Sequence, residues 1–226
     1  MVGWFWQCVE LLWPPTCAGC RTPGSWWCAA CDDATVLIRT PACPRCNRIT
    51  GTGRFCTNCR RRTALTGVAA GTYYREPVRS GIAALKYRHA RVVAPRLASY
   101  LLPALSRIPG LRTAVIVPVP LHRRRLRQRG HNQAALLADT VARVTGLRVS
   151  DDLVRTRRTV PQTGLDRRQR QRNLIGAFRW TGPSLRGRIV VLVDDVHTTG
   201  TTLDACATEL RKDGARQVWG LVLAKR

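Results

Sequence analysis

Four pairs of cysteines, each with two residues between its members, lie in the first 59 residues of the chain. A Cys-x-x-Cys turn points two thiolates at one metal ion, and two such turns complete the tetrahedral four-sulfur site typical of structural zinc. Eight ligands therefore suit two zinc ions, and neither ion keeps an open position for catalysis. The expected ligands are Cys17, Cys20, Cys28, Cys31, Cys43, Cys46, Cys56 and Cys59.

The spacing of the pairs does not determine which two pairs bind the same zinc ion. Seven residues separate the first pair from the second and nine separate the third from the fourth, so sequential pairing is the most local arrangement. Cross-bracing, first with third and second with fourth, is the alternative. In either case about 60 residues are too few for a large hydrophobic core, so we expect metal binding to supply much of the folding free energy.

A second chemical pattern lies near the C-terminus, where an aliphatic run over 189–193 is followed by two carboxylates and a hydroxyl-rich loop. Such a run is typical of a central parallel strand, and parallel sheets bind ligands beyond the carboxyl ends of their strands. Asp194 and Asp195 are suited to vicinal hydroxyls or a divalent cation. The loop over 198–202, with Gly200 permitting a tight turn, leads into a helix whose N-terminus favours a phosphate dianion. Together they predict a ribose 5-phosphate site.

The elements that must position these residues are predicted from hydrophobic periodicity. Strands are expected over 66–74, 113–117, 188–193 and 217–224, and helices over 77–88, 92–105, 132–145 and 202–212. Strands that alternate with helices predict a parallel sheet covered by helices on both faces.

The composition of the chain changes after three consecutive arginines, 60–62, beyond which Cys206 is the only cysteine. We therefore expect two domains. A small cysteine-rich zinc-binding domain is expected over 1–64, followed by an α/β domain over 65–226.

Charge is the strongest compositional feature, because 38 basic residues against 13 acidic ones leave a formal charge of +25. Thirty-five of the basic residues are Arg, which forms bidentate forks with phosphates where Lys offers a mobile point charge. The balance predicts an anionic partner: nucleic acid, a phosphorylated metabolite or a membrane surface. The alternative is a coding bias that places Arg on solvated faces.

Several classes of protein are disfavoured. No apolar run approaches the roughly 20 residues of a transmembrane helix, and a hydrophobic content of 45% argues against disorder. The first ten residues lack a basic region, and Glu10 interrupts their apolar stretch, so we expect no secretory signal. A cytoplasmic location is the resulting expectation, and in a reducing cytosol ten cysteines are more often metal ligands than disulfides.

The segment over 190–203 resembles the phosphoribosyl-diphosphate signature of the phosphoribosyltransferases. Further segments narrow the resemblance to the ComF family and extend it over nearly the whole chain. They are Lys86-Tyr87, the stretch over 117–122 followed by 129–133, and a set made up of Arg157, Gln162, Leu165, Arg170, Asn173 and 176–178. An N-terminal cysteine-rich zinc module also belongs to the pattern. The chain departs from it at His131, where the family often has Phe.

The resemblance implies a type I phosphoribosyltransferase-like domain, preceded by a double zinc ribbon, that binds phosphoribosyl diphosphate with Mg²⁺. It implies that Asp194 and Asp195, as catalytic residues, contact the ribose hydroxyls directly or through Mg²⁺. The residues implied to bind phosphoribosyl diphosphate are Val196, Thr198, Thr199, Gly200, Thr201, Thr202, Pro118, Arg129 and Arg170. Mg²⁺ and cationic side chains stabilise a leaving diphosphate. Two segments that could supply such cations, 121–130 and 155–172, hold 12 of the 35 Arg residues.

Three functions compete for this site. The first is a phosphoribosyltransferase, with an acceptor that no signature in the sequence identifies. The second, implied by the resemblance through natural transformation, is a DNA-uptake protein that binds single-stranded DNA beside a vestigial site, with a DNA-uptake helicase as a further candidate partner. The third is a regulator of nucleotide metabolism that senses phosphoribosyl diphosphate without turnover.

Overall fold

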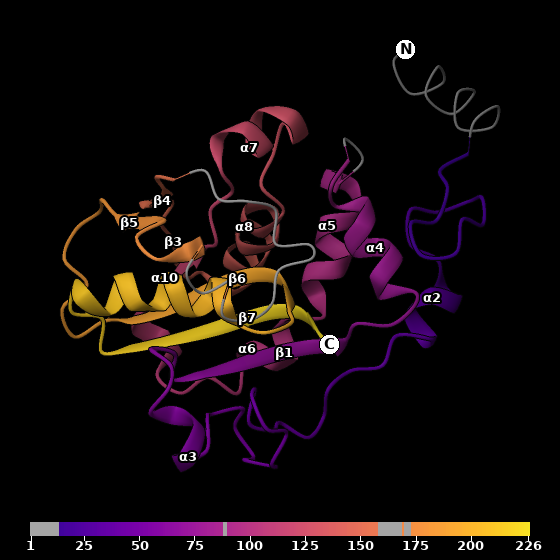
Figure 1. Ribbon diagram of the computed structural model, residues 1–226. Coiled ribbons are helices and arrows are strands. Elements are labelled where there is room, and N and C mark those ends of the chain that lie inside the picture. Colours follow the sequence, from indigo (N-terminus) through magenta and orange to yellow (C-terminus); the bar gives the residue numbers. More distant parts are fainter. Residues whose placement is uncertain (1–13, 88–89, 158–168, 170–172) are drawn as a thin grey trace.

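The α/β part of the chain is built on one parallel five-stranded sheet (Figure 1). The computed structural model describes residues 14–87, 90–157, 169 and 173–226. Every neighbouring pair of strands is parallel, and the order across the sheet is β1 (Gly67–Tyr73), β7 (Gln217–Lys225), β6 (Ile189–His197), β2 (Ala114–Pro118) and β3 (Arg148–Val149). The aliphatic runs of β6 and β7 suit this place, because central strands of a covered parallel sheet are buried on both faces.

Helices cover both faces of the sheet (Figure 1). The first face carries the connections between β1, β2 and β3, whose helices are α4 (Val78–Ala84), α5 (Ala90–Ser99), α6 (Leu102–Leu105) and α8 (Gln133–Thr145). The second face carries α10 (Thr201–Lys212), which connects β6 to β7, and the antiparallel pair β4 (Leu153–Arg155) and β5 (Phe178–Trp180). The predicted fold class is therefore confirmed.

The two hydrophobic cores share β6 between them. Val191 and Val193 belong to the first core, with α4, α5 and α8, whereas Val190 and Leu192 pack with α10 in the second. This alternation follows from the two-residue period of a strand. All four side chains are fully buried, and burying an aliphatic side chain of this size contributes about 1.5–3 kcal/mol.

Several details differ from the elements expected from periodicity, among them the end of α4 at Ala84. The helix expected over 92–105 is split into α5 and α6, because Pro103 has no amide proton to donate to the carbonyl four residues earlier. The strand expected to end at Val193 continues to His197, since its pairing with β7 continues. The short β3, β4 and β5, and the Arg-rich helix α7 (Arg123–Arg129), have too little apolar periodicity to be predicted.

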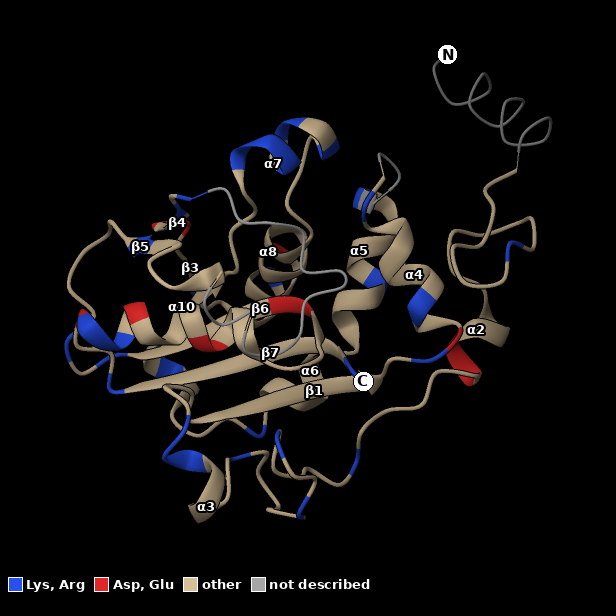
Figure 2. Cartoon of the chain, viewed as in Figure 1, with Lys and Arg blue, Asp and Glu red and all other residues tan. Residues whose placement is uncertain are grey.

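Basic side chains are spread over both parts of the molecule, with a dense group on α7 (Figure 2). Acidic side chains are fewer, and one group lies at the end of β6 (Figure 2). None of the helices in the described part of the chain combines the length and apolar character that crossing a bilayer requires.

The cysteine-rich segment lies along the β1 edge of the sheet in two halves (Figure 1). The first half contains α2 (Ala29–Asp33) and packs Trp27 against the first core. The second half contains α3 (Thr57–Arg60) and lies near the start of β1. Between the halves, the amide of Ile38 donates to the carbonyl of Gly71 at 2.9 Å. The domain boundary near residue 64 stays a prediction.

One carboxylate, Asp32, joins the first half to α5. Its Oδ1 accepts hydrogen bonds from Trp27 Nε1 at 2.9 Å, from Arg96 Nε at 2.7 Å and from the Tyr100 hydroxyl. Burial acts to raise the pKa of Asp32, but the hydrogen bonds from Tyr100 and Arg96 outweigh it and lower that pKa below its usual value. The ionised carboxylate therefore stabilises the docked first half.

We expect Asp32→Asn to lower the free energy of unfolding by about 1–3 kcal/mol, because three hydrogen-bond donors lose their charged acceptor. A carboxylate with a lowered folded pKa stabilises the fold at every pH above its unfolded pKa, and that contribution is lost as pH falls through the folded value. Urea denaturation should therefore show the same decrease in the free energy of unfolding for Asp32→Asn at pH 6 and at pH 8. Asp33→Asn, at an exposed neighbour, is the matched control; a loss no larger than the control's contradicts the assignment.

Candidate functional site

Pro118, the acidic pair and the loop over 198–202 lie at the carboxyl ends of β2 and β6. The two strands are neighbours, with Pro118 opposite Val193, and the amide of Val119 donates to the carbonyl of Val193 at 2.9 Å. The chain that leaves β2 turns towards α8 on the first face, whereas the chain that leaves β6 enters α10 on the second. Parallel sheets bind ligands where neighbouring connections diverge in this way.

The acidic pair belongs to the last part of β6. Asp194 and Asp195 are both half-buried, and the amide of Asp195 donates to Asp194 Oδ1 at 2.9 Å. No basic side chain in the described part of the chain lies within ion-pairing distance of either carboxylate. Burial, and then the charge of Asp195, raises the pKa of Asp194 well above its usual range. A cation, or hydrogen-bond donors from a ligand, would relieve this unfavourable pairing of like charges.

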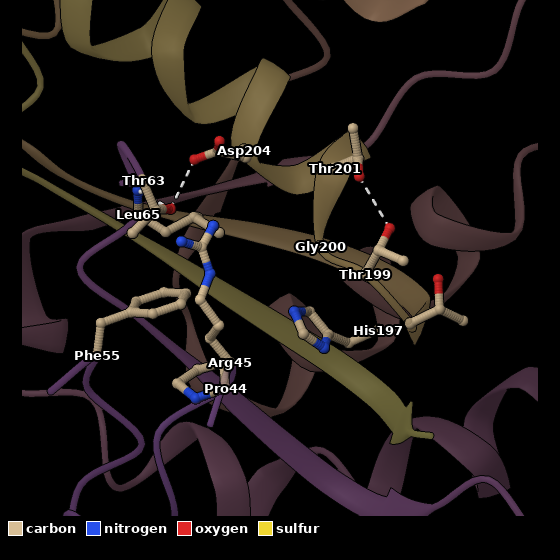
Figure 3. A pocket seen from close by; sticks show the side chains of 11 residues that line it. Pro44, Arg45, Phe55, Thr63, Leu65, His197, Thr199, Gly200, Thr201 and Asp204 are labelled. Atoms are coloured by element: carbon tan, nitrogen blue, oxygen red, sulfur yellow. Dashed lines mark hydrogen bonds between the residues drawn. The ribbon is translucent and has the colours of Figure 1, made fainter. Parts of the chain in front are cut away.

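A hydroxyl-rich loop joins β6 to α10 directly beyond the acidic pair. Gly200 has a left-handed conformation, with φ at 74°, and a Cβ atom there would lie 2.7 Å from Nε2 of the buried His197. The hydroxyls of Thr199 and Thr201 are hydrogen-bonded at 2.8 Å (Figure 3). The first turn of α10 has no side-chain cap, which leaves its backbone amides to hydrogen-bond an anion.

The other residues predicted around this loop occupy different environments. Val196 packs against the first core, Thr198 is exposed, and Thr202 is half-buried in the first turn of α10. Pro118 is the last residue of β2. Their contacts with a ligand stay predictions.

Of the two predicted arginines the structure describes Arg129, while Arg170 lies outside the described residues. Arg129 ends α7 and is half-buried. Burial, and then the charge of Arg125, lowers the pKa of Arg129. The charge of Asp195 opposes that shift, so the charges of Arg129 and Asp195 interact.

Two side chains fix the chain between β2 and α8. Asn132 Nδ2 donates to the carbonyl of Val119 at 3.0 Å, and its Oδ1 caps α8 by accepting from the amide of Ala134 at 3.2 Å. His131 Nε2 lies 2.8 Å from the carbonyl oxygen of Leu85. His131, the residue at which the chain departs from the family pattern, therefore makes a hydrogen bond to the end of α4.

Two residues absent from the predicted site, Cys206 and Arg155, have charges or burial that bear on this end of the sheet. Cys206 is fully buried in α10, and burial followed by the charge of Asp194 raises the pKa of its thiol. The guanidinium of Arg155 lies 5.5 Å from the ring centroid of Phe178, and its charge opposes the shift at Cys206. Only its place in the Arg-rich block over 155–172 could have indicated Arg155 from the sequence.

A cavity of about 210 Å³ opens beside the loop (Figure 3). One wall is the loop itself, over 197–201. The opposite wall includes Arg45 and Phe55 of the cysteine-rich segment. Asp204 Oδ1 accepts from the Thr63 hydroxyl at 2.6 Å, which ties the connecting chain to the first turn of α10 between the two walls.

The eight paired cysteines form two groups, in each of which the sulfur atoms lie within 4.8 Å of one another. The first group is Cys17, Cys20, Cys28 and Cys31, and the second is Cys43, Cys46, Cys56 and Cys59. This is the sequential arrangement. Burial acts to raise the pKa of the Cys43 thiol, but hydrogen bonds from backbone amides, chiefly that of Cys56, outweigh it and lower the pKa to about 6. The lowered pKa favours the thiolate form, which binds metal.

Comparisons with known proteins match both parts of the chain. A family model for a phosphoribosyl transferase domain matches residues 131–226, and one for a double zinc ribbon domain matches residues 8–60. Together with the two four-cysteine groups, the ribbon match supports structural zinc. The segment that carries Cys43, Cys46, Cys56 and Cys59 is named the second ribbon.

Relatives extend the match over nearly the full length. DNA utilization protein YhgH of Escherichia coli strain K12 is 37% identical, over 92% of this chain and 96% of that protein. Competence protein F of Haemophilus influenzae is 41% identical over 48% of this chain and 50% of its own length. Competence protein ComFC of Bacillus subtilis strain 168 is 25% identical over 83% of this chain and 78% of its own length.

Zinc content of paired variants tests the grouping. We expect about two zinc ions per wild-type chain, one in Cys17→Ser/Cys31→Ser, and none in Cys17→Ser/Cys43→Ser, because sequential sites place Cys17 and Cys43 on different ions. Cross-bracing predicts the reverse, with no zinc in Cys17→Ser/Cys31→Ser and one ion in Cys17→Ser/Cys43→Ser. Cys206→Ala, at a buried cysteine outside both groups, is the control and should keep both ions; atomic absorption on purified protein measures the content.

The pKa of Asp194 gives a second prediction. A carboxyl group whose folded pKa is raised destabilises the fold as pH rises above its unfolded value, because ionisation costs more in the folded chain. Asp194→Asn should therefore melt at a higher temperature than wild type in Mg²⁺-free buffer, and the difference should widen from pH 5 to pH 8. A difference that is constant or narrows over this range shows that Asp194 ionises freely.

Proposed function

Because the chain belongs to the ComF family, we propose that it binds phosphoribosyl diphosphate together with Mg²⁺. One observation carries the proposal: the acidic pair and the hydroxyl-rich loop lie where the connections from β2 and β6 diverge, and the charge of Arg129 interacts with that of Asp195. A ribose with a phosphate at one end and a diphosphate at the other needs these three kinds of group.

The acidic pair supports the ribose part of the proposal. Asp194 and Asp195 follow each other in the last part of β6, and vicinal hydroxyls are donors for carboxylate oxygens. Oxygen ligands of this kind are also those that Mg²⁺ takes in proteins, so the residues fit the ion. When bound, Mg²⁺ supplies positive charge against a departing diphosphate.

The loop over 198–202 is the proposed holder of the 5-phosphate. Gly200 lets the backbone turn tightly into α10, whose uncapped first amides can donate to the phosphate oxygens. Thr199 and Thr201 place hydroxyl groups at the same turn. The phosphate is thereby bound at the end of the helix that favours negative charge.

Arg129 and the chain after Pro118 are the proposed holders of the diphosphate. Arg129 is half-buried, and a charge that is partly removed from water acts more strongly on its neighbours. As the bond between ribose C1 and the diphosphate oxygen breaks, negative charge grows on that oxygen, and a fixed cation lowers the barrier. Family resemblance adds Arg170, outside the described residues, to this set.

Titration calorimetry tests the binding. Phosphoribosyl diphosphate should bind only when Mg²⁺ is present; the ion is left out of the control buffer rather than chelated, because a chelator would also remove zinc. Asp194→Asn/Asp195→Asn should weaken binding at least about tenfold, since hydrogen bonds to charged groups are lost. Asp151→Asn, at an exposed carboxylate before β4, is the matched control; equal affinity of the double variant and wild type contradicts the proposed role.

Release of diphosphate distinguishes the two forms that this function can take. Transfer of the phosphoribosyl group to an acceptor nucleophile releases one diphosphate per product, with inversion at C1. Binding without release in a screen of bases and amines would make the protein a sensor of phosphoribosyl diphosphate.

Single-stranded DNA is a second candidate ligand, favoured by the exposed arginines of α7. Five of the seven residues of this helix are Arg and none is acidic, and the helix stands clear of the sheet (Figure 2). Relatives of the chain are named for DNA utilization and competence. We propose that α7 contributes phosphate contacts to a DNA strand in addition to the sugar-phosphate site.

The salt dependence of DNA affinity tests this second function. The logarithm of affinity for an oligonucleotide should fall steeply with the logarithm of salt concentration. Arg123→Gln/Arg124→Gln/Arg127→Gln should reduce that slope by about 2, because each phosphate that an arginine neutralises contributes about 0.7 to it. The control, Arg60→Gln/Arg61→Gln/Arg62→Gln, removes the same charge from other exposed positions; an equal reduction in both would mean that net charge alone drives binding.

A further inference from the structure

The second ribbon forms one wall of the cavity beside the loop over 198–202. Arg45 and Phe55 of the ribbon lie across the cavity from Thr199 and Gly200 (Figure 3). A water molecule takes up about 30 Å³, so a cavity of about 210 Å³ has room for a phosphate group and several waters. The metal-binding part of the chain and the loop therefore meet at one space of ligand size.

The loop side of this cavity offers donors for an anion. Thr198, Thr199 and Thr201 line it with hydroxyl groups, beside the first turn of α10. Asp204 is the acidic residue in its wall, and its Oδ1 already accepts from the Thr63 hydroxyl at 2.6 Å and the Ala64 amide at 2.8 Å. These two donors partly offset the negative charge that Asp204 presents to a phosphate.

The ribbon side of the cavity offers a guanidinium. Arg45 is half-buried, and its Nη2 donates to the carbonyl of Arg62 at 3.2 Å. A guanidinium has five N–H donors, and the described part of the chain places no carboxylate within ion-pairing distance of this one. Arg96, by contrast, is paired with Asp32. The charge of Arg45 is therefore available to an anion in the cavity.

The position of Arg45 depends on the metal turn. It lies between Cys43 and Cys46, the two ligands that one Cys-x-x-Cys turn contributes. The amide of Cys43 donates to the carbonyl of Arg48 at 2.7 Å, and the amide of Asn47 donates to the carbonyl of Cys43 at 3.0 Å, which closes the turn. A metal ion that holds both thiolates therefore also fixes the backbone that carries Arg45.

We propose that Arg45 binds the phosphate group held by the loop over 198–202, so that the second ribbon is part of the ligand site. The ligand class is a phosphomonoester, here the 5-phosphate of a phosphoribosyl group, and the inference rests on the function proposed above. Arg forms bidentate, charge-assisted hydrogen bonds with phosphates. Losing such a bond weakens binding by about ten- to a hundredfold.

Three probes locate the contribution of Arg45: ribose 5-phosphate, phosphoribosyl diphosphate and inorganic diphosphate, each with Mg²⁺ in titration calorimetry. Arg45→Gln should bind the first two about ten- to a hundredfold more weakly than wild type and should bind diphosphate unchanged. Arg48→Gln, at an exposed position of the same ribbon outside the cavity, is the matched control and should leave all three affinities unchanged. Zinc content and melting temperature are measured for each variant.

A second substitution keeps the test decisive if Arg45→Gln loses zinc. Arg45→Met keeps a long aliphatic side chain without charge. The variant that retains two zinc ions is the one whose affinities are compared with those of the wild type. Unchanged affinity for ribose 5-phosphate in a zinc-loaded variant overturns the inference, as does an equal loss for all three probes, which would indicate a general charge effect. Failure of the wild type to bind phosphoribosyl diphosphate would instead overturn the proposed function itself.

Discussion

The site depends on backbone pairing between β6 and β7 that continues past Val193, where the aliphatic run of β6 ends. Asp194 pairs with Val222 and His197 with Lys225, so the strand conformation extends through the acidic pair. This pairing fixes the backbone of both aspartates at a half-buried position, and burial followed by the charge of Asp195 raises the pKa of Asp194.

The same strand end sets where the rest of the site lies. Immediately after β6 the chain must reverse onto the second face, and Gly200 makes that turn possible with a left-handed backbone that also avoids His197. The neighbouring strand β2 sends its connection to the other face, where Asn132 ties it to the start of α8. Divergence of the two connections brings Arg129 within range of Asp195.

The zinc ribbons are attached to this scaffold by specific polar contacts. Asp32 receives donors from Trp27, Arg96 and Tyr100 in the first half. In the second half Lys225 Nζ donates to Asn47 Oδ1 at 2.7 Å, next to the end of β7. The C-terminal strand β7 therefore contacts both the acidic strand β6 and the second ribbon that carries Arg45.

Much of this arrangement could be predicted from the sequence, because long elements with strong periodicity are determined locally. The aliphatic run before Asp194 predicted the central strand, and the Cys-x-x-Cys spacing predicted the metal groups. Arg155 and Arg45 could not be predicted, because their positions depend on packing between segments far apart in the chain. The split between α5 and α6 depends on Pro103, a local signal that apolar periodicity alone does not include. The short strand β3 forms by pairing with β2, which no local pattern specifies.

The proposed binding of phosphoribosyl diphosphate is tested most directly by phosphorus NMR of that compound titrated with the full-length, zinc-loaded chain and Mg²⁺. The account predicts that the signals of both the 5-phosphate and the diphosphate shift or broaden on binding, and that Asp194→Asn/Asp195→Asn restores the free spectrum at the same concentrations. Signals that remain those of the free compound at every protein concentration would contradict it.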